Sequence, residues 1–368
     1  MKTRTWLEAI AVILILSAPC ACRGDDEDIR WIDGKDIPTE GLAFSGEPRE
    51  LPYDRLPLSA KGRVTDGVWW NARSASGIQF RFATDSKTLR IRWCDVTPGK
   101  TMPIQALSGT SGIDVYHRPQ DGGKWEYGWT GFPKNDPKTH EYGGELVIEG
   151  LSNGEYVVNA PLYNGLKSLA VGIDAGAAFG KVRPRANGAE KPIVFYGTSS
   201  TQGAAASRPG LAFTALIGRN LDIPVVNLGF SGSGKMEMEM VDYVAAIDAC
   251  CYVIDTPGNM SPKLVRERYE KFVRELHRRR PSVPLVLAEN RHYRASPNPI
   301  PGFAEVMRPL AARLRAEGWK LAYIRTEDMF PTDIGDTSVE GGHPNDFGMK
   351  QLAASYGKAI REALAQTR

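Results

Sequence analysis

The chain contains few cysteines and few histidines, with five of each among 368 residues. Once the N-terminal segment that carries Cys20 and Cys22 is set aside, only Cys94, Cys250 and Cys251 remain. These three are too few and too unevenly spaced for a disulfide framework. The histidines stand singly, and neither a CxxC nor an HxxxH spacing occurs. Because the sequence offers no metal-binding pattern, we expect a function that requires no metal or other cofactor.

An excess of either charge is also missing. The sequence has 46 basic and 43 acidic residues, a net charge of +3, and no Lys/Arg block with interleaved aromatic residues. Such blocks are typical of proteins that bind single-stranded nucleic acid, so nucleic acid is not an expected partner. The densest basic run, residues 277–280, closes a predicted amphipathic helix, where positive charges interact favourably with the helix dipole.

The apolar stretch near the N-terminus, residues 9–18, is short. A membrane span takes about 20 residues, so we expect no stable membrane span. Basic residues precede the stretch and small residues follow it, which is typical of a secretory signal peptide over residues 1–22. We therefore expect export to the periplasm or the cell exterior. Cys20 leaves a lipoprotein as the alternative, although Pro19 fits a lipid-modification site poorly.

Apolar and polar residues alternate with a period of two through much of residues 40–180, most clearly at 78–82 and 89–93. This pattern is typical of half-buried antiparallel strands, and it predicts a β-sandwich or jelly-roll domain over residues 28–180. Most of the tryptophans belong to this part. We expect them mainly in the core, and a sugar-binding surface is the alternative. They include Trp69, Trp70, Trp93, Trp125 and Trp129.

Residues 179–191 interrupt the alternation with Pro184, Gly188 and several charges, and they are predicted to link two domains. Beyond them, short apolar strands alternate with helical segments, as in a parallel sheet covered by helices. We therefore predict an α/β fold with a three-layer α/β/α domain over residues 190–368. Its strands are expected at 193–196, 225–228, 252–254, 285–288 and 321–324.

Polar residues gather where these strands end, which is where active sites form in open α/β sheets. The first strand is followed by Ser199, the second by Gly232 and the third by Asn259, and His343 precedes the last predicted helix. This order of Gly-x-Ser, Gly, Asn and a late His resembles the four blocks of the SGNH (GDSL-like) hydrolases. The resemblance covers residues 190–368 and implies a flavodoxin-like hydrolase domain.

A second resemblance concerns the N-terminal part. Residues 111–116, Ser-Gly-Ile-Asp-Val-Tyr, are similar to the GxDLY motif of a β-domain that commonly precedes such hydrolases in bacteria. The two resemblances support one another, because they imply the same order of domains.

The SGNH resemblance implies a role for each matching residue. Ser199 matches the nucleophile and His343 the base, since a serine hydroxyl needs a neighbouring base to take its proton. The backbone N–H groups of Ser199 and Gly232 and the amide of Asn259 match the oxyanion hole, in which each donor is typically worth about 3 to 4 kcal/mol of barrier. Ser200 competes with Ser199 only because it is adjacent, and the motif register favours Ser199.

Two residues depart from the family pattern. Thr198 replaces the aspartate of Gly-Asp-Ser, which is not part of the catalytic triad. Glu340 stands where the family has aspartate, three residues before the histidine, and its longer carboxylate can still orient His343. We therefore assign Glu340 as the orienting acid, with Asp333, Asp336 or a backbone carbonyl as alternatives.

Together these residues predict an exported serine esterase that removes acetyl or other short acyl groups from a carbohydrate. The carbohydrate is inferred by analogy with esterases that join a jelly-roll to an SGNH domain. The alternatives are a short-chain lipase or acylhydrolase on other esters, and a glycan-binding protein with an inactive hydrolase domain. Residues 229–235 also match a phosphate-binding P-loop, but Met236 replaces its Ser or Thr, so nucleotide is not an expected ligand. The sequence gives no oligomeric state.

Overall fold

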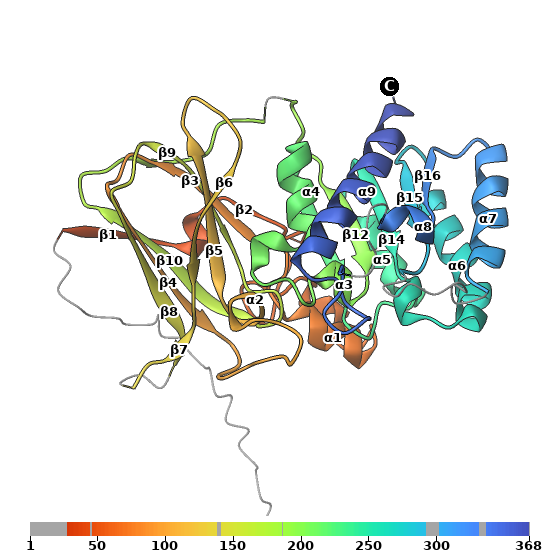
Figure 1. Ribbon diagram of the computed structural model, residues 1–368, viewed down its shortest axis with the longest axis horizontal. Coiled ribbons are helices and arrows are strands. Elements are labelled where there is room, and N and C mark those ends of the chain that lie inside the picture. The colour runs from red at the N-terminus through yellow and green to blue at the C-terminus, as the bar shows by residue number, and fades with distance from the viewer. Residues whose placement is uncertain are drawn as a thin grey trace, which may run out of the picture.

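The computed structural model describes residues 28–44, 46–137, 141–185, 187–291, 302–330 and 336–367. The signal peptide predicted for residues 1–22 lies outside these ranges. A β-rich N-terminal part and an α/β C-terminal part lie side by side, which confirms the predicted fold class (Figure 1). No helix among the described residues has the length and apolar character needed to cross a membrane.

The N-terminal part is built from two antiparallel sheets. One has the strand order β1-β10-β4-β8-β7, and the other has the order β11-β3-β9-β5-β6, with β2 paired to β3. Phe82 on β3 and Ile91 on β4 are fully buried in one core that both sheets share, as in a β-sandwich. The strands are β1 (Ile29–Asp33), β2 (Thr39–Glu40), β3 (Gln79–Thr84), β4 (Thr88–Asp95), β5 (Ile113–Pro119), β6 (Glu126–Gly131), β7 (Lys134–Asn135), β8 (Tyr142–Glu149), β9 (Gly154–Asn159), β10 (Leu166–Asp174) and β11 (Phe179–Gly180).

The C-terminal part contains one parallel sheet with the order β13-β12-β14-β15-β16. Every residue of β12 and β14 is buried, because helices cover both faces of the sheet. In this strand order the crevice for a ligand is expected at the carboxyl ends of β12 and β14. The strands lie within one residue of the predicted ranges: β12 (Ile193–Gly197), β13 (Val225–Gly229), β14 (Cys251–Asp255), β15 (Leu285–Ala288) and β16 (Leu321–Ile324).

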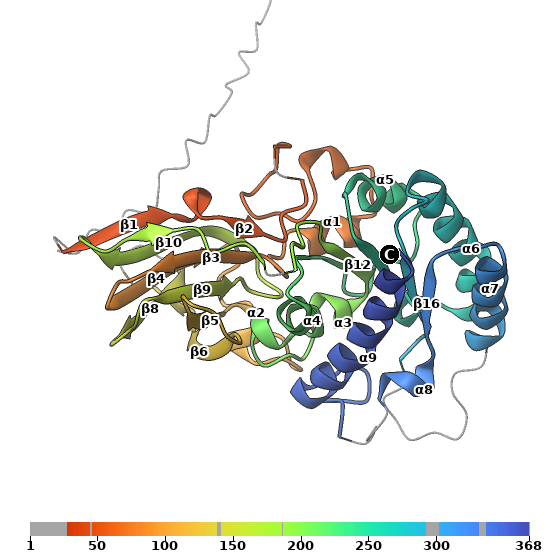
Figure 2. The ribbon, with the colours of Figure 1, turned by 90° about the horizontal axis from the view of Figure 1, so that it is seen from above.

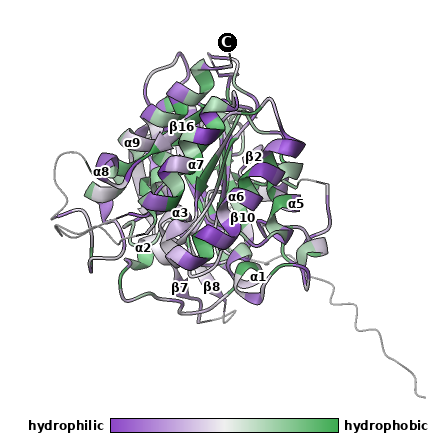
Figure 3. Ribbon diagram, turned by 90° about the vertical axis from the view of Figure 1, so that its right-hand side faces the viewer, coloured by the Kyte–Doolittle hydropathy of each residue, from purple (hydrophilic) through white to green (hydrophobic). Residues whose placement is uncertain are grey.

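Two groups of helices cover the parallel sheet, with α5, α6 and α7 on one face and α4, α8 and α9 on the other (Figure 2). The outer helices α6 and α7 carry hydrophilic residues toward the viewer in Figure 3. Helix α6 is capped at its N-terminus by Ser261, whose Oγ accepts the N–H of Leu264 at 3.2 Å. The helices are α1 (Asp66–Ala72), α2 (Leu107–Thr110), α3 (Ser199–Gln202), α4 (Phe213–Leu221), α5 (Glu239–Ala246), α6 (Pro262–Arg279), α7 (Ala304–Ala316), α8 (Thr326–Met329) and α9 (Asp346–Ala365), with 3-10 turns η1 (Gly34–Asp36), η2 (Leu58–Ala60), η3 (Pro209–Leu211) and η4 (Pro257–Asn259).

Helix α1 is a departure from the β pattern expected for the N-terminal part. Val68, Trp69 and Ala72 are buried in the core on the α5–α7 face of the parallel sheet. Their spacing of three to four residues places them on one helix face, which is why this segment is not a strand. The expectation that the tryptophans lie mainly in the core holds for Trp69 and Trp93, which are buried. Trp125 and Trp129 are only partly buried, and Trp70 is 68% exposed.

Candidate active site

Ser199 lies where strand β12 meets helix α3. β12 ends at Gly197, and the N–H of Thr198 donates to Thr201 Oγ1 at 3.2 Å. The turn is tight, because a Cβ atom at Gly197 would collide with the side chain of Thr201. As the first residue of α3, Ser199 has a backbone N–H with no earlier helical carbonyl to bind. The fold thus presents its hydroxyl and its N–H at the carboxyl end of β12.

His343 lies in a loop just before helix α9, far along the chain from Ser199. A β-bridge between Ser338 and Pro344 closes the loop, and Asn345 caps α9. In this position His343 Nε2 lies 2.9 Å from Ser199 Oγ. The side chain of His343 is 27% exposed, so the pair is open to solvent on one side.

Glu340 completes a hydrogen-bonded chain with these two residues, because its Oε1 lies 2.5 Å from His343 Nδ1. When Nδ1 donates to the carboxylate, Nε2 is left free to accept a proton from the serine hydroxyl. Of the alternative acids, Asp333 lies outside the described residues, and Asp336 makes no hydrogen bond to His343. Among the residues with described positions, the carboxylate bonded to His343 is that of Glu340.

The loop after β13 brings Gly232 to the same edge of the sheet. Gln202 Oε1 on α3 accepts the N–H of Ser231 at 2.9 Å, and the N–H of Phe230 donates to the carbonyl of Gly197 at 3.0 Å. Gly232 has a φ of +64°, and a Cβ atom there would point into open space. The glycine is therefore needed for its left-handed backbone conformation rather than for lack of room.

Asn259 lies on η4, directly after β14. Its Nδ2 donates to the carbonyl of Phe230 at 3.1 Å and to the carbonyl of Ser233. Because an amide nitrogen has only two N–H groups, an oxyanion can use Asn259 only by sharing or replacing one of these bonds. Asn259 does not cap the following helix α6, since Ser261 is its N-cap.

A buried polar network beneath α3 was not among the predicted site residues. Asp255, which ends β14 and is 1% exposed, accepts from Thr201 Oγ1 at 2.5 Å, from the Tyr356 hydroxyl at 2.8 Å and from Arg291. The network joins helix α3 to β14 and α9. The available sequence signal was an ionisable residue at the end of an otherwise apolar strand.

The N-terminal part also reaches this edge of the sheet. The Tyr163 hydroxyl donates to the carbonyl of Ser199 at 3.2 Å, and burial raises the pKa of Tyr163, which keeps the donor protonated. Arg55 is fully buried and donates to two backbone carbonyls at the end of β13, at 2.8 Å each. On α1, Asn71 Nδ2 donates to the carbonyl of Ser231 at 3.0 Å. None of these contacts is predictable from the sequence, because they join segments far apart in the chain.

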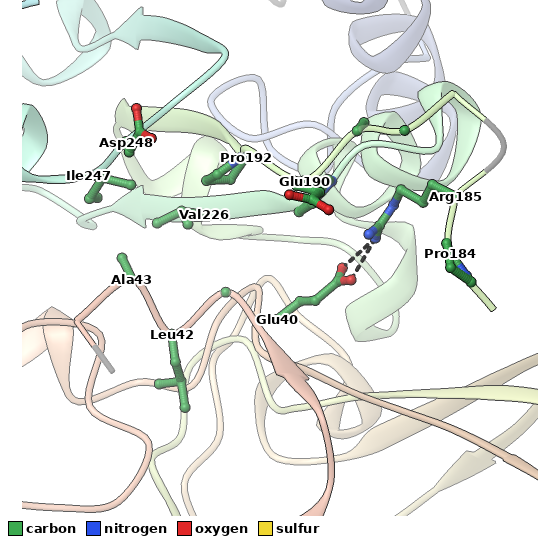
Figure 4. A pocket seen from close by; sticks show the side chains of 14 residues that line it. Glu40, Leu42, Ala43, Pro184, Arg185, Glu190, Pro192, Val226, Ile247 and Asp248 are labelled. Atoms are coloured by element: carbon green, nitrogen blue, oxygen red, sulfur yellow. Dashed lines mark hydrogen bonds and ion pairs between the residues drawn. The ribbon is translucent and has the colours of Figure 1, made fainter. Parts of the chain in front are cut away.

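A cavity of about 530 Å³ lies at the opposite edge of the parallel sheet (Figure 4). Pro192 and Pro224, which precede β12 and β13, line it together with residues of the linker. Arg185 and Glu40 also line it, and Arg185 Nη2 donates to both carboxylate oxygens of Glu40, at 2.6 and 2.8 Å. Because active sites of open α/β sheets form at the carboxyl ends of the strands, this cavity is not the candidate catalytic site.

Both parts of the chain match known protein families. Residues 190–361 match the GDSL-like lipase/acylhydrolase family, and residues 29–179 match the GxDLY domain described as the N-terminus of SGNH hydrolase-type esterases. No curated protein matches the sequence significantly.

Several solved structures have the same architecture. A Bacteroides ovatus protein designated a GDSL-like lipase is 27% identical, with a TM-score of 0.81, over 92% of this chain and 98% of its own. The salicylyl-acyltransferase SsfX3 of a tetracycline biosynthetic pathway is 20% identical, with a TM-score of 0.71, over 90% and 97%. A family two carbohydrate esterase from Clostridium thermocellum is 13% identical, with a TM-score of 0.55, over 79% and 94%. The chain therefore combines a GxDLY-type N-terminal domain with a GDSL-like (SGNH) hydrolase domain, and it is a carboxylic ester hydrolase.

Proposed function

We propose that the chain is an exported serine esterase that removes acetyl or other short acyl groups from a carbohydrate. Ser199 is the nucleophile, His343 the base and Glu340 the acid that orients the histidine. The observation that carries this proposal is the hydrogen-bonded chain from Ser199 Oγ to His343 Nε2, at 2.9 Å, and from His343 Nδ1 to Glu340, at 2.5 Å.

The proposed reaction has two halves. Ser199 Oγ bonds to the ester carbonyl carbon while its proton passes to His343 Nε2, and the tetrahedral intermediate then expels the sugar hydroxyl, which takes that proton. Water attacks the acyl-enzyme in the same way and releases the carboxylic acid. The N–H groups of Ser199 and Gly232 hold the oxyanion, and Asn259 joins them when it releases one of its two loop carbonyls.

A carbohydrate substrate is supported by the surface beside the site. On α1, Trp70 and Asn71 lie three and four residues after Gly67, so each is a neighbour of Gly67 on the helix surface. A Cβ atom at Gly67 would collide with Ser233, and Asn71 donates to the carbonyl of Ser231, so this side faces the loop that carries Gly232. The exposed indole of Trp70 therefore offers a flat apolar face next to the site. The solved structures with a similar fold include carbohydrate esterases, which supports this substrate class.

Turnover of p-nitrophenyl acetate by the purified protein, measured beside Ser199→Ala, tests the catalytic assignment. We expect the wild type to turn over and the variant to lose at least about a thousandfold in kcat. Ser200→Ala is the matched control, because it removes the adjacent hydroxyl, and it is expected to retain turnover. An equal rate for the wild type and Ser199→Ala would overturn the proposal.

The substrate is tested with acetylated xylan and with p-nitrophenyl palmitate. Release of acetate from the polysaccharide, with little hydrolysis of the palmitoyl ester, is expected. Trp70→Ala is expected to raise KM for the polysaccharide and to leave p-nitrophenyl acetate turnover unchanged. Preference for the palmitoyl ester would favour a lipase. Export is tested by the N-terminal sequence of the mature protein, which is expected to start near residue 23.

A further inference from the structure

The GxDLY-type motif lies on β5, at the face of the β-domain that meets the hydrolase domain. Asp114 is fully buried, and its Oδ1 accepts Asn159 Nδ2 at 2.7 Å. Its Oδ2 accepts Arg208 Nη1 at 2.7 Å and the N–H of Gly210 at 2.9 Å. Two of these three donors belong to the hydrolase domain. Asp114, the acidic residue of the motif, therefore binds the segment of the hydrolase domain that follows α3.

The glycine and the tyrosine of the motif serve the same contact. The Tyr116 hydroxyl accepts Arg208 Nη1 at 2.7 Å and Arg219 Nη2 at 3.1 Å, and the Arg219 guanidinium lies 3.8 Å from the centre of the tyrosine ring. A Cβ atom at Gly112 would collide with the carbonyl of Gly131 and with the backbone of Ser108 on α2. Gly112 thus lets α2 approach β5, and Ser108 on α2 donates to the carbonyl of Ser207 at 2.5 Å.

The segment held in this way, residues 207–210, is called here the bridge segment. It follows α3 after four residues, and Gln105 Nε2 fixes the chain between them by donating to the carbonyls of Gly203 and Ala206 at 3.1 Å each. On its other side, the N–H and the hydroxyl of Ser207 donate to the Asp346 carboxylate at 2.8 and 2.6 Å. Asp346 is the first residue of α9, three positions after the candidate base.

The bridge segment is therefore connected to the elements that carry both members of the candidate catalytic pair. One end continues from the helix that begins with Ser199, and Ser207 is bonded to the helix that follows His343. We propose that Asp114 and Tyr116 are positioning residues for Ser199 and His343, because they fix the bridge segment from the β-domain. This inference rests on the proposed function, in which these two residues form the catalytic pair.

The effect of a substitution follows from how Asp114 is bonded. Both of its oxygens accept, one from Asn159 and the other from Arg208 and Gly210. An amide has only one oxygen, so Asp114→Asn places an N–H₂ group against donors on one side or the other. We expect the bridge segment to shift. A misplacement of about 1 Å between reacting groups can cost about a hundredfold in rate, so kcat is expected to fall by about ten- to a hundredfold with little change in KM.

Glu155→Gln is the matched control. Glu155 is 1% exposed and lies on β9 next to β5. It binds Arg118 Nε at 2.5 Å and accepts the N–H of Arg183, at the start of the linker, at 2.8 Å. The control therefore makes the same carboxylate-to-amide change in a buried ion pair on the same two strands, away from the hydrolase domain. Both variants are expected to lose stability, but only Asp114→Asn is expected to lose kcat.

The experiment measures kcat, KM and the rate of fluorophosphonate labelling for both variants, with the folded fraction determined by circular dichroism. Asp114→Asn is expected to lower kcat and the labelling rate, and Glu155→Gln to change neither. Arg208→Gln is expected to resemble Asp114→Asn, and the double variant to be no slower than either single one. Wild-type kcat and labelling in folded Asp114→Asn, with Ser199→Ala inactive, would overturn this inference alone. A fully active Ser199→Ala would instead overturn the proposed function.

Discussion

Glu340→Gln is a substitution whose effect can be worked out from the geometry of the site. The change removes the charge beside His343 and keeps the length of the side chain. Glu340 Oε1 accepts from His343 Nδ1 at 2.5 Å, whereas Oε2 has no hydrogen bond from any residue of the described ranges. The glutamine amide can therefore rotate so that its oxygen still accepts from Nδ1, which preserves the required tautomer.

The expected loss follows from this freedom. In trypsin-like triads, replacing the aspartate by asparagine costs about 10⁴ in kcat because the wrong tautomer is fixed. Here only the stabilisation of the imidazolium is lost, and the Glu340 side chain is 39% exposed, so water screens part of that interaction. We expect kcat to fall by about ten- to a hundredfold, which is about 1.4 to 2.7 kcal/mol of barrier.

The assay is kcat for p-nitrophenyl acetate, compared with Glu340→Leu, which cannot accept from Nδ1. Glu340→Leu is expected to lose at least tenfold more than Glu340→Gln. A Glu340→Gln variant within twofold of the wild type would refute the stabilisation of the imidazolium by the Glu340 charge. A Glu340→Leu variant within twofold of the wild type would refute the orienting role. Equal losses for the two variants would refute the argument from amide rotation.

Three further outcomes are expected. Arg291→Met removes the cation bonded to buried Asp255, which is expected to cost about 3 to 5 kcal/mol in urea unfolding, and a loss below about 1 kcal/mol would contradict this. Burial raises the pKa of Asp95 to about 8, so between about pH 4 and 8 the folded state binds more protons than the unfolded state, and the free energy of unfolding falls as pH rises. Asp95→Asn is expected to reduce this fall. An unchanged dependence of the free energy of unfolding on pH would contradict the expectation. Burial raises the thiol pKa of Cys94 and Cys250 to about 11, so mass mapping at pH 8 should find them alkylated by iodoacetamide only after unfolding, not in the native protein.

Local sequence patterns were sufficient to predict the parallel sheet. Strands such as β12 and β14 are buried over their whole length, so each one appears in the sequence as a short apolar run. The junctions after these strands then identified Ser199 and Asn259 as neighbours, because parallel strands end at one edge of the sheet. The contact of Glu340 with His343 was expected from the family resemblance, in which an acid stands three residues before the histidine.

Contacts between the two domains could not be predicted in this way. A pattern of apolar residues marks the buried face of α1 but does not say that this face packs on the hydrolase sheet. Arginine is usually found at the protein surface, whereas Arg55 is buried because it donates to carbonyls at the end of β13. In the sequence Asp114 stands out only as part of the GxDLY-type motif, and its partner Arg208 lies 94 residues away. Pairings of this kind depend on tertiary structure.

The most direct test of Ser199 as the nucleophile is fluorophosphonate labelling of the intact protein followed by peptide mapping. One adduct per chain is expected, on the peptide that carries Ser199, and Ser199→Ala is expected to remain unlabelled. His343→Ala is expected to label at least about a hundredfold more slowly, because the serine loses its base. An adduct that persists in Ser199→Ala, or a wild-type protein that does not react, would contradict the assignment.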